Sequence, residues 1–168
     1  MSKRSAARAW LLLLLLPLAA CGYSLRGSDV ISAQFDSLAL DLDQPNSEFS
    51  RLLRRSLDVA DVENLLTTEA RSSDAILSVR NERVVSRPVT VNPRARAAQH
   101  EMRMSVDIML LQDSVVLIDA ETLMVERIYF EDIANIAGNQ EEREIIAAEM
   151  RRDLVNQLMR RLAATNAT

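Results

Sequence analysis

Hydrophobic and polar residues alternate with a period of two in several stretches of this chain, a pattern typical of β-strands with one buried face. Less regular alternations cover residues 38–42, 75–88 and 123–130. The clearest covers residues 101–111, where the apolar positions are Met102, Met104, Val106, Ile108 and Leu110. The pattern predicts four strands, and the polar positions within 101–111 predict a sheet with one polar face.

The segments between these strands predict loops and turns. Residues 89–98 predict an exposed, basic hairpin loop, and Pro88 just before it predicts a sheet edge or a bulge. Residues 114–118 either prolong the preceding strand or begin a new one after a kink, and 119–122 predict a turn. Residues 62–74 predict a polar connection with some strand character at its start.

Two stretches have the 3.6-residue period of amphipathic helices. The first follows the break at Pro45, with Asn46 or Ser47 as its N-cap, and its apolar stripe consists of Phe49, Leu52, Leu53 and Leu57. The second is longer, with Asn139 as N-cap and Glu142 near the position of a capping box. Its apolar positions are spaced four apart: Ile146, Met150, Leu154, Leu158 and Leu162.

The element order is therefore strand, helix, strand, strand, strand, helix. This order predicts an α+β fold in which two helices pack on one face of a four-stranded mixed sheet. We assign residues 35–164 to this domain and residues 165–168 to a tail.

The first 20 residues have the pattern of a secretory signal peptide. Lys3, Arg4 and Arg8 precede an apolar run with six consecutive leucines, and small residues follow up to Cys21. The run is too short to span a bilayer, which takes about 20 residues. We expect residues 1–20 to be removed and residues 21–34 to be a lipidated tether.

Cys21 is the only cysteine and therefore cannot form an internal disulfide. Its position directly after Leu18-Ala19-Ala20 resembles the lipobox of bacterial lipoproteins, in which the cysteine thiol is acylated. The alternative is a buried or incidental free thiol.

Removal of the signal peptide changes the charge balance, because it contains three of the 20 basic residues and none of the 24 acidic ones. The remaining chain has a formal charge of −7, and all its cations are arginines. An acidic domain is a poor match for nucleic acid, which binds clustered positive charge. Arginine suits bidentate phosphate contacts, but we favour a codon bias as the explanation for its exclusive use.

The residues that could perform catalysis are few. His100 is the only histidine, and the chain has neither a glycine-rich phosphate loop nor metal-ligand spacing. A serine nucleophile would require His100 as its base. We therefore expect no enzyme, no metal and no cofactor beyond lipid attached to Cys21. Arg94 and Arg96 in the predicted hairpin loop either bind an anionic lipid phosphate or keep the loop solvated.

The start of the exported chain, Cys21-Gly22-Tyr23-Ser24-Leu25-Arg26-Gly27, resembles the Cys-Gly-aromatic-His-Leu-Arg opening of the LptE family of lipopolysaccharide-assembly lipoproteins. Ser24 replaces the histidine that is usual there. Leu38-Ala39-Leu40 before the Pro45-Asn46 break, the helix at Ser50-Arg51-Leu52, the strand 101–111 and the closing helix 140–162 resemble the same family.

This resemblance implies two helices on a four-stranded sheet, in agreement with the periodicity. It implies a non-enzymatic outer-membrane lipoprotein, anchored at the periplasmic face by a diacylglycerol and an N-acyl chain on Cys21, and Gly22 is consistent with that sorting. It further implies that the domain plugs the LptD β-barrel and assists lipopolysaccharide delivery to the outer leaflet, with lipopolysaccharide contacts at Arg94 and Arg96. The alternative is an envelope lipoprotein that scaffolds a different outer-membrane complex.

Overall fold

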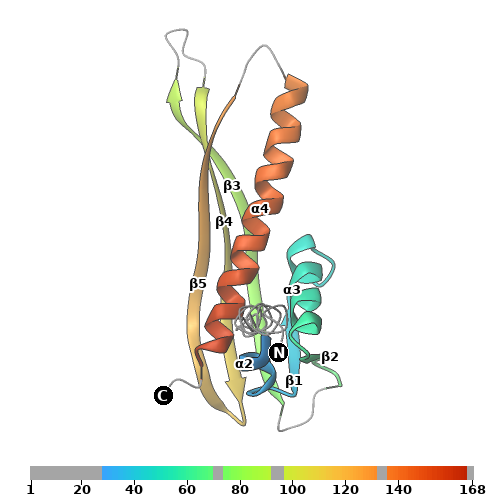
Figure 1. Ribbon diagram of the computed structural model, residues 1–168. Helices are drawn as coiled ribbons and strands as arrows, with labels where there is room; N and C mark the ends of the chain where they lie inside the picture. The colour runs from blue at the N-terminus through green and yellow to red at the C-terminus, as the bar shows by residue number, and fades with distance from the viewer. Residues whose placement is uncertain (1–27, 70–73, 92–96, 132–135, 166–168) are drawn as a thin grey trace, which may run out of the picture.

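The computed structural model describes residues 28–69, 74–91, 97–131 and 136–165 (Figure 1). In chain order its elements are α2 (Ser28–Ser32), β1 (Ser37–Leu42), α3 (Glu48–Val59), β2 (Glu63–Leu66), β3 (Ala75–Val91), β4 (Ala97–Gln112), β5 (Val115–Phe130) and α4 (Ile136–Ala163). No helix in the described part of the chain is both long and apolar enough to cross a membrane.

The α+β class and the two main helices are confirmed, but the sheet has five strands rather than four, in the order β2-β1-β3-β4-β5. β1 pairs in parallel with β2 and β3, and the other pairs are antiparallel. The additional strand is β2, which lies within the predicted polar connection. It has only four residues, all partly or fully exposed at the sheet edge, and therefore shows no alternation that sequence could reveal.

The core lies between the sheet and the two helices, which cover the same face (Figure 1). One row of buried side chains crosses four strands: Leu40 opposite Leu77, Leu77 opposite Leu110, and Leu110 opposite Ile118. The helices contribute the apolar stripes expected of them, and the fully buried members are Phe49, Leu53, Leu57, Met150, Leu154, Leu158 and Leu162. The strand periodicity over 101–111 is confirmed as well, since all five of its apolar positions are buried.

α3 begins where the sequence predicted. The Ser47 hydroxyl accepts a hydrogen bond from the Ser50 amide at 3.0 Å, which satisfies one of the free N–H groups of the first turn. The predicted N-cap of the last helix is wrong, because α4 begins at Ile136 and Asn139 is buried within it. Part of the stretch expected to be a tether also forms structure: Ile31 of α2 is buried, and Gln34 donates to the Ala163 carbonyl at the end of α4.

The predicted turn at 119–122 is wrong, because β5 continues through these residues, with a register shift against β4 between Ile118 and Glu121. The chain reverses at Asp113 and Ser114, whose φ angles are 49° and 67°. Gln112 pairs with Val115, so the loop has two residues, and two positive φ angles match a type I′ hairpin turn. The hairpin loop expected at 89–98 is shorter than predicted, because β3 continues to Val91 and β4 starts at Ala97.

The helices differ in length, and this difference divides the molecule into two halves. α4 has 28 residues and α3 has 12, or about 42 and 18 Å at 1.5 Å per residue. We call the half that α3 does not reach the distal half; it comprises residues 83–91 of β3, 97–105 of β4, 124–130 of β5 and the first turns of α4. In Figure 1 it is the upper part of the molecule.

Candidate functional site

The sequence-predicted site residues lie outside the part of the chain that the structure describes. Cys21 precedes α2, and Arg94 and Arg96 lie between the end of β3 and the start of β4. Val91 at the end of β3 pairs with Ala97 at the start of β4, so the predicted loop segment 92–96 joins these strands at the distal end of the sheet.

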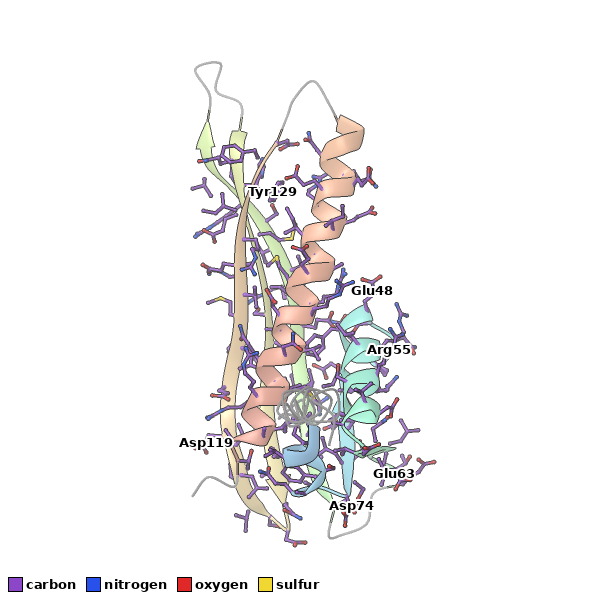
Figure 2. The ribbon with its side chains drawn as sticks, viewed as in Figure 1. Glu48, Arg55, Glu63, Asp74, Asp119 and Tyr129 are labelled. Atoms are coloured by element: carbon purple, nitrogen blue, oxygen red, sulfur yellow. The ribbon has the colours of Figure 1, made fainter. Side chains whose placement is uncertain are left out.

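A group of polar and aromatic side chains lies on the helix-covered face near this loop. The imidazole of His100 stacks on the ring of Tyr129, with centroids 5.4 Å apart and ring planes 22° from parallel. The Tyr129 hydroxyl and the Ser86 hydroxyl lie 3.1 Å apart, within hydrogen-bond distance. His100 Nε2 is 2.6 Å from a carboxylate oxygen of Glu131. The group connects β3, β4 and β5 to the start of the segment that leads to α4, and Figure 2 shows Tyr129 in the distal half.

The opposite face of the sheet carries a network of charges in the distal half. Arg87 of β3 donates two hydrogen bonds of 3.1 Å to Glu101 of β4, and Arg103 bridges Glu101 and Glu126. The hydrogen bonds from Arg87 lower the pKa of Glu101 below its ordinary value, burial opposes this effect, and the charges of Arg87 and Arg103 reinforce it. These pairs keep the open face polar, as the sequence predicted, although Ile128 and Phe130 at its β5 rim are exposed.

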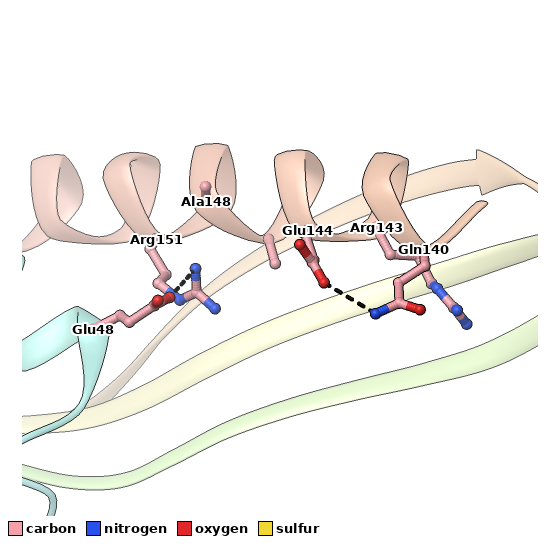
Figure 3. A pocket seen from close by; sticks show the side chains of 7 residues that line it. Glu48, Gln140, Arg143, Glu144, Ala148 and Arg151 are labelled. Carbon is pink, nitrogen blue, oxygen red and sulfur yellow. Dashed lines mark hydrogen bonds and ion pairs between the residues drawn. The ribbon is translucent and has the colours of Figure 1, made fainter. Parts of the chain in front are cut away.

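A groove of about 500 Å³ runs along the distal half of α4. Figure 3 shows Gln140, Glu144 and Arg151 projecting from α4 toward the strands, with Arg151 paired to Glu48 of α3 and Gln140 bonded to Glu144. Arg143 lines this groove as well, and it makes no hydrogen bond or ion pair with any other residue that the structure describes. The remaining lining residues are Ala147 and Ala148.

These features can hold anionic or extended ligands, and they show no arranged catalytic set. Within the described ranges no three histidine, cysteine or acidic residues are grouped as metal ligands would be. The described contacts of His100 are to Tyr129 and Glu131, and Ser86 faces Tyr129. Sequence reasoning considered His100 only as a possible base and missed Arg143 and Tyr129, because both sit in otherwise ordinary amphipathic patterns and gain their setting only from the tertiary arrangement.

The fold and site define an α+β domain with a charged open sheet face and a groove along its long helix. Residues 35–162 match the model of the family described as "LptE: Lipopolysaccharide-assembly". The chain belongs to this family, whose members are non-enzymatic assembly lipoproteins. It is 25% identical over 150 residues to the LPS-assembly lipoprotein LptE of Pectobacterium atrosepticum, covering 89% of this chain and 80% of that protein.

Solved structures share the fold. A crystal structure of rare lipoprotein B from Shewanella oneidensis matches with a TM-score of 0.70 and 18% identity, over 78% of this chain and 96% of that one. A solution structure of lipoprotein B from Nitrosomonas europaea matches with a TM-score of 0.72 and 19% identity, over 88% of this chain and 94% of that one. At these identities the likeness concerns the fold alone.

Proposed function

We propose that this chain is an outer-membrane lipoprotein that assembles with the LptD β-barrel as its plug and assists lipopolysaccharide delivery to the outer leaflet. The observation that carries the proposal is the family match over residues 35–162, which spans the folded domain from the start of β1 to the end of α4. The related protein from Pectobacterium atrosepticum is itself described as an LPS-assembly lipoprotein.

The surface of the domain supports the plug role physically. The lumen of a membrane barrel is polar, so a plug needs a charged exterior rather than an apolar belt. The open sheet face meets this requirement through Arg87, Glu101, Arg103 and Glu126, which pair with one another. An obligate apolar interface would instead require these charges to be buried, at a large desolvation cost.

Membrane attachment is proposed through Cys21, with a diacylglycerol and an N-acyl chain on one residue. Stable anchoring takes more than one acyl chain, and several chains on a single cysteine fulfil this. Lipopolysaccharide contacts are proposed at Arg94 and Arg96, because guanidinium groups bind phosphates bidentately and both residues lie in the 92–96 loop at the distal end.

The test is co-purification from outer membranes. The full-length chain with a C-terminal tag is extracted in mild detergent, and we expect it to elute with LptD in a stable complex identified by mass spectrometry. A free monomer under gentle extraction would contradict the plug role, and a different stable partner would favour scaffolding of another complex. Cys21→Ser serves as the anchor control: palmitate labelling and membrane retention should be lost.

A further inference from the structure

β3, which has 17 residues, loses its neighbour on one side well before its midpoint. β1 pairs only with the first residues of β3, from Leu38 opposite Ala75 to Leu42 opposite Val79. Beyond this point no described strand lies on the β1 side of β3, and in the stretch 81–89 every residue except the partly buried Glu82 is exposed. The distal half of a central strand is therefore a free sheet edge.

Helix α4 does not cover this edge. In the row Val84–Met104–Val125, which crosses β3, β4 and β5, Met104 is fully buried and Val125 is 6% exposed, whereas Val84 is 48% exposed. The burial pattern indicates that α4 lies over β4 and β5 and leaves the helix-facing side of β3 open. The groove lined by Arg143 and Ala147 runs along α4 on this face of the sheet (Figure 3).

The backbone direction at the edge follows from the contacts beside it. Asn81 adopts a φ of 53°, and the register with β4 shifts between Arg80 and Arg83, so a bulge resets the alternation here. The side chain of Gln44, just after β1, donates to the Glu82 carbonyl at 3.1 Å, which places that carbonyl on the free edge. Since N–H and C=O groups of alternate residues point to the same side of a strand, those of Val84 and Ser86 also point to the free edge.

Pro88 follows in the same alternation. The N–H that proline lacks would point to the free edge, so its absence removes no hydrogen bond to β4. Arginines 83 and 87 flank the two free positions. Natural proteins limit unspecific strand pairing by keeping the free part of an edge short and by placing charged residues and proline beside it. It leaves room for one short, specific strand.

We propose that the edge at Val84 and Ser86 receives an extended acidic segment of the barrel protein as an added strand. This inference rests on the proposed function, because it takes LptD as the partner. An added strand satisfies the free backbone groups, which a lipid chain would leave unpaired. The guanidinium of Arg143, unpaired among the described residues, and the positive charge of Arg83 favour an acidic partner, whereas Arg87 is already paired with Glu101. A second copy of this chain would bring the same arginines against each other.

The decisive variant is Val84→Pro, which removes a free-edge N–H and leaves the β4 side of the strand intact. Val84→Thr is the matched control, because it changes the side chain and retains the N–H. The full chain and LptD are co-expressed, and the LptD recovered per tagged chain is measured after detergent extraction. We expect Val84→Pro to lower recovery about tenfold, the effect of losing one or two hydrogen bonds, and Val84→Thr to match the wild type.

A second pair of variants keeps the test valid if the proline disturbs folding. Arg143 lies on a helix surface, so its replacement does not disturb the strand. Arg143→Glu should lower LptD recovery severalfold, whereas Arg143→Lys should retain most of the wild-type recovery. Recovery unchanged in both Val84→Pro and Arg143→Glu would overturn the added strand while leaving the plug role intact. Absence of LptD from the wild-type sample would instead refute the proposed function. A wild-type dimer that Val84→Pro converts to a monomer would assign the edge to a second copy and overturn the proposal.

Discussion

His100 of β4 and Tyr129 of β5 are register partners whose rings stack, with centroids 5.4 Å apart, in the distal half of the sheet. Tyr129 also reaches across β4 to the hydroxyl of Ser86 on β3. The side chain of Tyr129 thus links β3, β4 and β5 in the half of the sheet against which α3 does not pack.

This arrangement predicts separate effects for the ring and the hydroxyl of Tyr129. Tyr129→Phe should lower the free energy of unfolding by about 0.5–1.5 kcal/mol, the contribution of one hydrogen bond. Tyr129→Ala should cost about 3–5 kcal/mol, because it leaves a cavity at a position only 3% exposed. Urea denaturation measures both. In a double-mutant cycle, Ser86→Ala combined with Tyr129→Phe should cost less than the sum of the single changes, and strict additivity would contradict the bond.

The lowered pKa of Glu101 predicts a specific acid sensitivity. A carboxyl whose folded-state pKa lies below its unfolded value, about 4.3, stabilises the fold above that value and loses this contribution as the pH falls through the folded-state pKa. The hydrogen bonds from Arg87 are the largest cause of the shift. Arg87→Ala should therefore flatten the fall in unfolding free energy below about pH 5. Arg55→Ala, on the exposed outer side of α3 (Figure 2), is the control and should leave the pH profile unchanged.

The bulge in β3 depends on a residue that tolerates a positive φ. Asn81, at φ 53°, donates to Asp107 at 2.7 Å, and Thr122 donates to the other oxygen of the same carboxylate at 2.6 Å. Asn81→Gly keeps the backbone conformation and should cost about 1 kcal/mol for the lost bond. Asn81→Val should cost about 1–3 kcal/mol more, because a β-branched residue is strained there. Equal melting temperatures for the two variants would show that the bulge is not held by the Asn81 conformation.

Sequence periodicity predicted the strands and helices that contribute the core. It failed where contacts between elements distant in sequence determine the local structure. The row Leu40, Leu77 and Leu110 was readable because each residue belongs to an alternation or stripe with one buried face. Glu121 suggested a turn, but it lies within β5 and forms an ion pair with Arg161 of α4, a contact that no local pattern reveals. β2 was too short and too exposed for its pattern to show.

The candidate site was less predictable than the fold for a related reason. The groove along α4 exists because α4 is more than twice as long as α3, and the free edge of β3 exists because β1 ends at Leu42. The sequence predicted these two helices and two strands approximately, but the site depends on the residues at which they end. Boundaries are what periodicity determines least well, as the start of α4 at Ile136 instead of after Asn139 also shows.

The buried stripe of α4 predicts a strong contrast between two positions on the same helix. Leu154→Asp places an unpaired charge at a fully buried position and should destabilise the domain by about 3–5 kcal/mol. Ile145→Asp makes the same kind of change at a position 54% exposed and should stay within about 0.5 kcal/mol of the wild type. Thermal unfolding of both variants measures the difference, and a near-neutral Leu154→Asp would mean that the helix face is misassigned.

The proposed lipopolysaccharide contacts predict a loss of binding without a loss of fold. Arg94→Ala combined with Arg96→Ala should weaken binding of purified lipopolysaccharide at least about tenfold, since hydrogen bonds to charged groups contribute about 1.5–3 kcal/mol each. Arg54→Ala combined with Arg55→Ala removes the same charge from α3 in the other half of the molecule and serves as the matched control. A specific contact weakens binding only in the first pair. Equal weakening in both pairs would mean that net charge, rather than the loop, determines affinity, and the contact assignment to Arg94 and Arg96 would then be wrong.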